Sequence, residues 1–165
     1  MKIKKITRHP KIVGDFGEDI VLYWLSKYGF ECAFVDHTGI DIIARNPHTP
    51  EVMGISVKSR TRIEGKEEDY VKIESKDFDN AVAACKAFRC VPYFAIVVDA
   101  GDTIRGFILP MAHLLKLFPK GKTASWKMSK AYLDKYSKDS HIKSFVFRTE
   151  TTNWWSGQQT APADG

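Results

Sequence analysis

The sequence has no long apolar run and few cysteines. None of its apolar stretches approaches the roughly 20 residues that a membrane-spanning helix requires. The basic start, MKIKKITRHPKI, is not followed by an apolar stretch, so we do not expect a signal peptide. The three cysteines, Cys32, Cys85 and Cys90, are odd in number and form no CxxC pair, which disfavours a disulfide frame and a zinc site. We therefore expect a cytoplasmic protein with reduced core cysteines.

Charge is distributed unevenly along the 165 residues. The net charge is +5, but residues 1–12 carry five Lys or Arg and no acid, and residues 111–148 carry nine against two acids. Between them, residues 13–110 carry eleven basic residues against sixteen acids. Basic segments attract phosphates at long range, and a clustered acidic centre can hold a cation. A solvated lysine-rich surface is the simpler alternative, and charge alone leaves both open.

Hydrophobic periodicity predicts an α/β fold. Helical spacing runs from Asp15, which can cap a helix, to Tyr28, and Gly29 can end it. A second helix is expected from Ser75, and a short third helix after Pro110. A lysine-rich region follows, with a further helix near 128–137. Strand patterns cover residues 30–36, 39–45, 51–62, 70–74, 92–100, 103–110 and 143–148. A helix between two strands lets them run parallel, so we expect a mixed central β-sheet with helices on both faces.

The domain organisation follows from these patterns. We expect a basic arm over residues 1–12, a single domain over 13–148 and a flexible tail over 149–165. Trp154 and Trp155 are unusual in a polar tail. They could dock on the domain, pack in a dimer or stack on bases, and docking agrees best with the burial tendency of tryptophan.

Four residues form a candidate site within this scaffold. Glu18 is expected in the first turn of the first helix, and Asp41 in the second strand. In GISVKSR, Ser56 and Lys58 share one face of the third strand because side chains alternate along a strand. Each has an alternative explanation: Asp15 and Glu18 fit a capping box, Asp41 a turn, Lys58 an edge strand, and Ser56 an ordinary strand serine.

Four segments, in this order over residues 13–110, carry a resemblance: GDFGEDIVLYWLSKYGFEC, GIDIIAR, GISVKSR and VKIESKDFDNAVAACKAFRCVPYFAIVV. They resemble the PD-(D/E)xK nuclease superfamily and, within it, the archaeal Holliday junction resolvases. The resemblance implies a restriction-endonuclease-like fold and cleavage of DNA, branched DNA included, with Mg²⁺ or Mn²⁺ by a homodimer. It implies that Asp41 is the main metal ligand, that Glu18 is a second ligand or holds metal-bound water, and that Lys58 acts on the attacking water or the phosphate.

The sequence departs from the family pattern at Ser56, where the family has Glu, Asp or sometimes Gln. A neutral hydroxyl is a poor ligand for Mg²⁺, which prefers charged oxygens. Either the site is degraded, or another acid substitutes. Glu51 lies on the opposite face of the strand by parity. The remaining candidates lie near the second helix and stay open: Glu74, Asp77 and Asp79.

Basic residues near the site are candidate phosphate contacts. They are Arg60, Arg62, the lysines of 116–143 and, in the arm, Lys2, Lys4 and Lys5. Three functions remain: a metal-dependent endonuclease, a catalytically inactive module that binds nucleic acid or protein, and an α/β domain for a small ligand. The histidines have no shared spacing and indicate surface or loop positions; they include His37, His48, His113 and His141.

Overall fold

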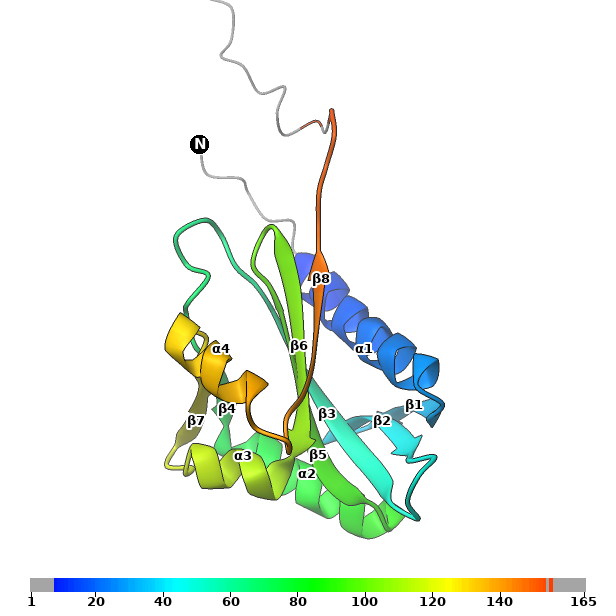
Figure 1. The fold of residues 1–165 in the computed structure, drawn as a ribbon. Coiled ribbons are helices and arrows are strands. Elements are labelled where there is room, and N and C mark those ends of the chain that lie inside the picture. Colours follow the sequence, from blue (N-terminus) through cyan, green and yellow to red (C-terminus); the bar gives the residue numbers. More distant parts are fainter. Residues whose placement is uncertain (1–7, 154, 156–165) are drawn as a thin grey trace, which may run out of the picture.

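The computed structural model describes residues 8–153 and residue 155 (Figure 1). Lys2, Lys4, Lys5 and Trp154 lie outside this part of the chain. The elements in chain order are α1 (His9–Lys27), β1 (Glu31–His37), β2 (Ile40–Arg45), β3 (Val52–Thr61), β4 (Val71–Glu74), α2 (Ser75–Phe88), β5 (Val91–Asp99), β6 (Thr103–Pro110), α3 (Met111–Leu117), β7 (Thr123–Trp126), α4 (Lys130–Ser137) and β8 (Lys143–Arg148).

The central sheet has six strands in the order β1-β2-β3-β5-β6-β8. The chain passes from β3 through α2 into β5, and β3 and β5 pair in parallel, as predicted. The other neighbours in this sheet pair antiparallel. Tight turns at Gly39 and Gly101, both of which have positive φ, join β1 to β2 and β5 to β6. The prediction of a mixed sheet is confirmed.

Helices cover both faces of the sheet (Figure 1). On one face, α1 packs Val21 and Leu25 against β3 residues such as Ile55. The opposite face carries α2, α3, α4 and the small antiparallel sheet of β4 and β7. The hydrophobic core on this face includes Phe78 and Trp126. Because α1 and α2 lie on opposite faces of β3, side chains alternating along that strand reach either one helix or the other.

Helix α1 begins earlier than the sequence predicts. It starts at His9, and Pro10 occupies the first turn, where a fixed φ and a missing N–H are compatible with a helix. Asp15 is therefore no cap; it pairs with Lys11 one turn earlier, at 2.8 Å. Residues 9–12, which the prediction assigned to the arm, are helical. The predicted end is confirmed, since Gly29 follows the last turn with a φ of 85°.

Strand β7 was not predicted. It lies in the lysine-rich region, where Ala124 and Trp126 alternate with half-buried Thr123 and Ser125. The Trp126 ring stacks on Tyr136 of α4 with centroids 4.1 Å apart, so this region belongs to the core. The three cysteines are free thiols, as predicted. Within residues 8–153, no helix is both long and apolar enough to cross a membrane.

Candidate active site

Glu18 lies in the middle of α1, because the helix begins at His9. The capping-box alternative for Glu18 is therefore wrong: the N-cap position is Arg8, and no acid lies in the first turn. Next to Glu18, Gly17 is buried against Ser59 of β3. The absence of a side chain at Gly17 lets α1 approach β3 closely, and this approach brings the half-buried Glu18 carboxylate near the sheet.

Asp41 lies in β2 and is tied to the next strand. Its Oδ2 accepts a hydrogen bond from the backbone N–H of Val57, at 2.6 Å. Burial raises the pKa of Asp41 above its ordinary value, and the charge of Asp77 adds to this effect. The Val57 N–H and the charge of Lys58 act in the opposite direction. Asp41 is thus a partly desolvated carboxylate within electrostatic reach of one cation, Lys58, and of two further acids, Asp77 and Glu18.

Lys58 forms an ion pair with an acid that the sequence left as one of several candidates. Its Nζ lies 3.0 Å from Oδ1 of Asp77, and the two side chains are 21% and 22% exposed. The second oxygen of Asp77 accepts the backbone N–H of Glu74 at 3.0 Å, at the start of α2. Asp77 therefore faces β3 from the first turn of α2 and is held there by a cap.

The other candidate acids have different partners. Glu74 pairs with Lys76 at 3.2 Å, and Asp79 pairs with Lys120 at 3.0 Å. Glu51 accepts the hydroxyl of Tyr93 at 2.7 Å, near the start of β3. Of the four acids considered as substitutes, Asp77 is the one that contacts Lys58.

Ser56 is only 3% exposed and lies on the strand between the levels of Gly54 and Lys58. Its parity places it on the α2 face, since Gly54 packs against Cys85 of α2 and Lys58 pairs with Asp77. A carboxylate at this position would be almost fully removed from water, whereas a hydroxyl is tolerated there at smaller cost.

The acids of the site repel one another. Burial raises the pKa of Glu18, and the charge of Asp41 is the next largest cause, followed by Asp15 and Asp19. Repulsion between partly desolvated carboxylates is relieved by a cation, and carboxylate oxygens are the ligands that Mg²⁺ prefers. The carboxylates of the site are therefore ligands of the type that a hard divalent cation such as Mg²⁺ binds. In the part of the chain described, the carboxylates of Glu18, Asp41 and Asp77 are not all within 4.8 Å of one another, so one ion cannot touch all three directly in this arrangement and would reach at least one of them through water.

A basic groove lies beside this site. It has a volume of about 410 Å³ and is lined by Lys58, Arg60, Lys72, Lys76, Asp77, Glu74 and residues of α1 and β3. Lys72 and Lys76 were not predicted as site residues. They flank the start of α2, and only the pairing of β4 with β7 and the packing of α2 bring them to β3. The sequence offers no spacing signal that connects them with Lys58.

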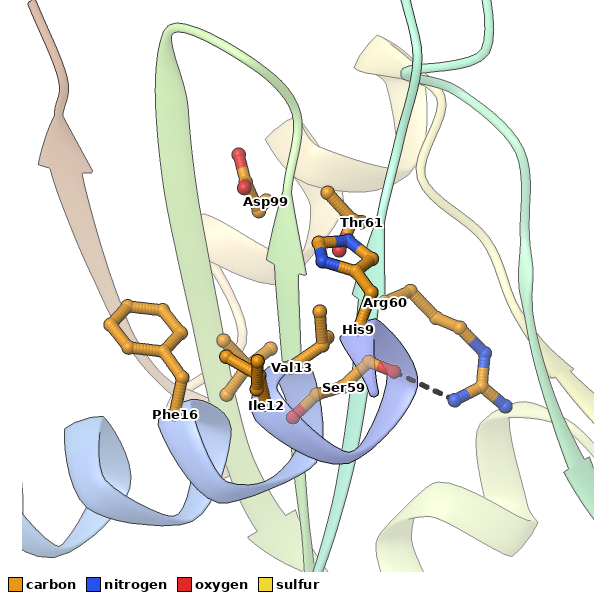
Figure 2. Close-up of a pocket in the computed structure, with 9 residues that line it drawn as sticks. His9, Ile12, Val13, Phe16, Ser59, Arg60, Thr61 and Asp99 are labelled. Atoms are coloured by element: carbon orange, nitrogen blue, oxygen red, sulfur yellow. Dashed lines mark hydrogen bonds between the residues drawn. The ribbon is translucent and has the colours of Figure 1, made fainter. Parts of the chain in front are cut away.

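The two predicted arginines differ in their surroundings. Arg60 is exposed and donates to its neighbour's carbonyl, Ser59 O, at 2.7 Å. Figure 2 shows its side chain extending away from a small pocket of about 170 Å³ between α1 and the end of β3. That pocket contains none of the four predicted catalytic residues. Arg62 is half-buried and donates to the carbonyls of Asp69 and Tyr70, which ties down the loop before β4.

Comparison with known proteins supports the fold. A scan against models of protein families finds no match, and a search of curated proteins finds none either. Fifteen chains of solved structures match. One is Archaeoglobus fulgidus Hjc, a Holliday junction resolvase from an archaeal hyperthermophile, with a TM-score of 0.50 and 19% identity over 72% of this chain and 84% of that chain. This likeness establishes the fold, a restriction-endonuclease-like mixed sheet flanked by helices, and leaves activity to other evidence.

Proposed function

We propose that this protein is a metal-dependent endonuclease that cleaves DNA, with Asp77 in the role of the acid missing at position 56. The observation that carries the proposal is the convergence of side chains from four elements. Glu18 of α1 and Asp41 of β2 repel each other, Asp41 is attracted to Lys58 of β3, and Lys58 pairs with Asp77 of α2. Perturbed carboxylates clustered beside a basic groove are typical of a functional site.

Each residue has a role in this proposal. Asp41, with Glu18 and Asp77, would hold Mg²⁺ or Mn²⁺. The metal would supply neutralisation of the phosphate charge and a water of lowered pKa. Lys58 carries its positive charge at the mouth of the groove, where an ammonium can hold the phosphate or the attacking water by hydrogen bonds. Ser56 keeps the centre of the sheet packed and takes no part in the chemistry.

The basic groove would hold the DNA backbone. Arg60, Lys72 and Lys76 surround Lys58 there, and such side chains contact phosphates without reading sequence. Lys2, Lys4 and Lys5 would add contacts from the N-terminal arm. Arg62 has a smaller part, because its guanidinium already donates to two backbone carbonyls. Branched DNA and a homodimer belong to the proposal through the resemblance to resolvases.

The proposal is tested with branched, nicked and linear DNA in the presence of Mg²⁺ or Mn²⁺. The wild type should cleave at least one of these substrates, and Asp41→Asn should lower the rate by about a hundredfold or more. Asp36→Asn is the matched control, since Asp36 is an exposed acid on β1 and loses the same charge. Equal cleavage by Asp41→Asn and Asp36→Asn would place the reaction elsewhere.

A second function, binding of nucleic acid without cleavage, is favoured by one observation. Lys58 is paired with Asp77, and one oxygen of Asp41 accepts the Val57 N–H, so both side chains have a protein partner in the absence of a metal. This alternative predicts DNA binding that weakens steeply with salt, no cleavage with either metal, and equal affinity for wild type and Asp41→Asn. Absence of both cleavage and binding would contradict the two proposals together.

A further inference from the structure

Two histidines that are 28 positions apart in the sequence meet at one aspartate. Nε2 of His113 lies 2.7 Å from Oδ2 of Asp139, and Nδ1 of His141 lies 3.4 Å from Oδ1. The imidazole rings stack with centroids 4.6 Å apart and an angle of 23° between their planes. The three potential ligand atoms all lie within 4.8 Å of one another. The prediction of a surface or loop position is confirmed for His141, which lies in an exposed turn, and is wrong for His113, which lies in α3 with its side chain 15% exposed.

The fold prepares this arrangement from two elements. His113 lies in α3, directly after β6, and its side chain is 15% exposed. Asp139 and His141 lie in the turn between α4 and β8. In that turn, Oδ1 of Asp139 accepts the backbone N–H of His141 at 3.0 Å, and Ile142 N–H donates to the Asp139 carbonyl at 3.1 Å. Two of the three side chains are thus positioned by one tight turn.

We propose that His113, Asp139 and His141 form a binding site for a divalent transition-metal ion such as Zn²⁺, Co²⁺ or Ni²⁺. The two imidazole nitrogens favour these ions over Mg²⁺, and the carboxylate is a ligand that zinc sites use as well. A simple His–Asp ion pair needs one imidazole, whereas here a second ring nitrogen faces the other carboxylate oxygen. His141 is 66% exposed, so the ion has access from solvent and room for water ligands.

The site is distinct from the candidate active site. Its ligands come from α3 and the α4–β8 turn, whereas Glu18, Asp41 and Asp77 come from α1, β2 and α2. One nearby cation opposes metal binding: Nζ of Lys143 donates to the carbonyl of Ser140, within the same turn, at 2.7 Å. Removal of this charge in Lys143→Gln should therefore strengthen metal binding.

The test is a Co²⁺ titration of the full chain without an affinity tag, in excess Mg²⁺, followed by visible absorption and by competition with Zn²⁺. We expect one Co²⁺ per chain with this site intact. His113→Ala and His141→Ala should each weaken binding by about tenfold or more, and His48→Ala, which removes an exposed loop histidine, should not. Far-UV circular dichroism with chelator present checks that each variant is folded. If His113→Ala does not fold, His141→Ala decides the test, because His141 is exposed.

Two outcomes would overturn the proposal: no Co²⁺ binding by the wild type, or equal binding by wild type and His141→Ala. Asp41→Asn separates this proposal from the proposed nuclease. Co²⁺ binding that survives in Asp41→Asn and is lost in His141→Ala supports the histidine site whether or not DNA is cleaved. Binding lost in Asp41→Asn and kept in His141→Ala would assign the ion to the carboxylates instead.

Discussion

The close contact between α1 and β3 depends on the absence of a side chain at Gly17, so Gly17→Ala should lower the free energy of unfolding. A Cβ added at Gly17 would lie 1.7 Å from Oγ and 2.9 Å from Cβ of Ser59, and 3.6 Å from Cγ1 of Val57. The first two distances are too short for any packed pair of atoms, so in Gly17→Ala the helix must move away from the strand. Forcing extra volume into a packed interface costs about 1–3 kcal/mol.

The same helix provides a matched control. Replacing glycine by alanine in a helix interior is by itself favourable by about 0.5–1 kcal/mol. A Cβ at Gly14 would meet nothing within 4 Å, so Gly14→Ala should show this gain alone. Gly17→Ala combines the gain with overpacking, so its net loss should lie between about 0 and about 2.5 kcal/mol. Because the gain is common to both variants, they should differ by the overpacking cost of about 1–3 kcal/mol in the free energy of unfolding.

Urea denaturation of both variants and the wild type measures this difference. If Glu18 acts as proposed, Gly17→Ala should also lower DNA cleavage, because displacement of α1 carries the neighbouring carboxylate away from Asp41. A Gly17→Ala protein as stable as Gly14→Ala would refute the reasoning, since it would mean that α1 does not press on Ser59.

Three further predictions concern the same region. A double-mutant cycle with Lys58→Ala and Asp77→Ala should give a coupling energy of about 1 kcal/mol, because the pair is only about one-fifth exposed. Additive effects would contradict the ion pair. Glu18→Gln should stabilise the fold at neutral pH. Burial and the charge of Asp41 raise the pKa of Glu18, so the wild-type protein loses stability as pH rises from the ordinary pKa of a glutamate through the raised one. Urea denaturation from about pH 3 to about pH 7 should show this gain vanish at the acid end, and a gain independent of pH would rule out the charge as its cause. Ser59→Ala should leave stability unchanged or raise it by about 1 kcal/mol, because within the described residues the Ser59 Oγ is buried without a hydrogen-bond partner. If thermal unfolding shows that the variant is less stable by more than about 1 kcal/mol, the Ser59 hydroxyl does form a hydrogen bond and the reasoning is wrong.

Local patterns in the sequence were sufficient for most of the fold. Strands such as 103–110 have the expected bounds, because alternation and a Gly101 turn are local features. The parallel pairing of β3 with β5 followed from the α2 helix between them. Local patterns failed for β7, a four-residue strand in a lysine-rich segment whose burial depends on Tyr136 and α4. They also failed for residues 9–12, which were predicted to belong to an arm and form the first turn of α1.

The candidate site could be predicted only where its residues follow a strand pattern. Asp41 and Lys58 are on neighbouring strands, so alternation and strand order were sufficient to bring them together. The partner of Lys58 required the packing of α2, which no local spacing specifies, and three acids remained equivalent in the sequence. The histidine cluster was missed for the same reason, because His113 and His141 meet only through the docking of the α4–β8 turn on α3.

The structure shows why an acid is easier to accommodate at Asp77 than at Ser56. At Ser56, which is 3% exposed, a carboxylate would lose almost all its hydration, and its charge would need compensation from a metal at all times. Asp77 is 22% exposed, lies in the first turn of a helix, where negative charge is favoured, and is paired with Lys58. In the role proposed for it, Asp77 supplies a charge near Asp41 without the folding penalty of a carboxylate buried at position 56, and a motif that is defined by spacing along a single strand cannot register an acid on a neighbouring helix.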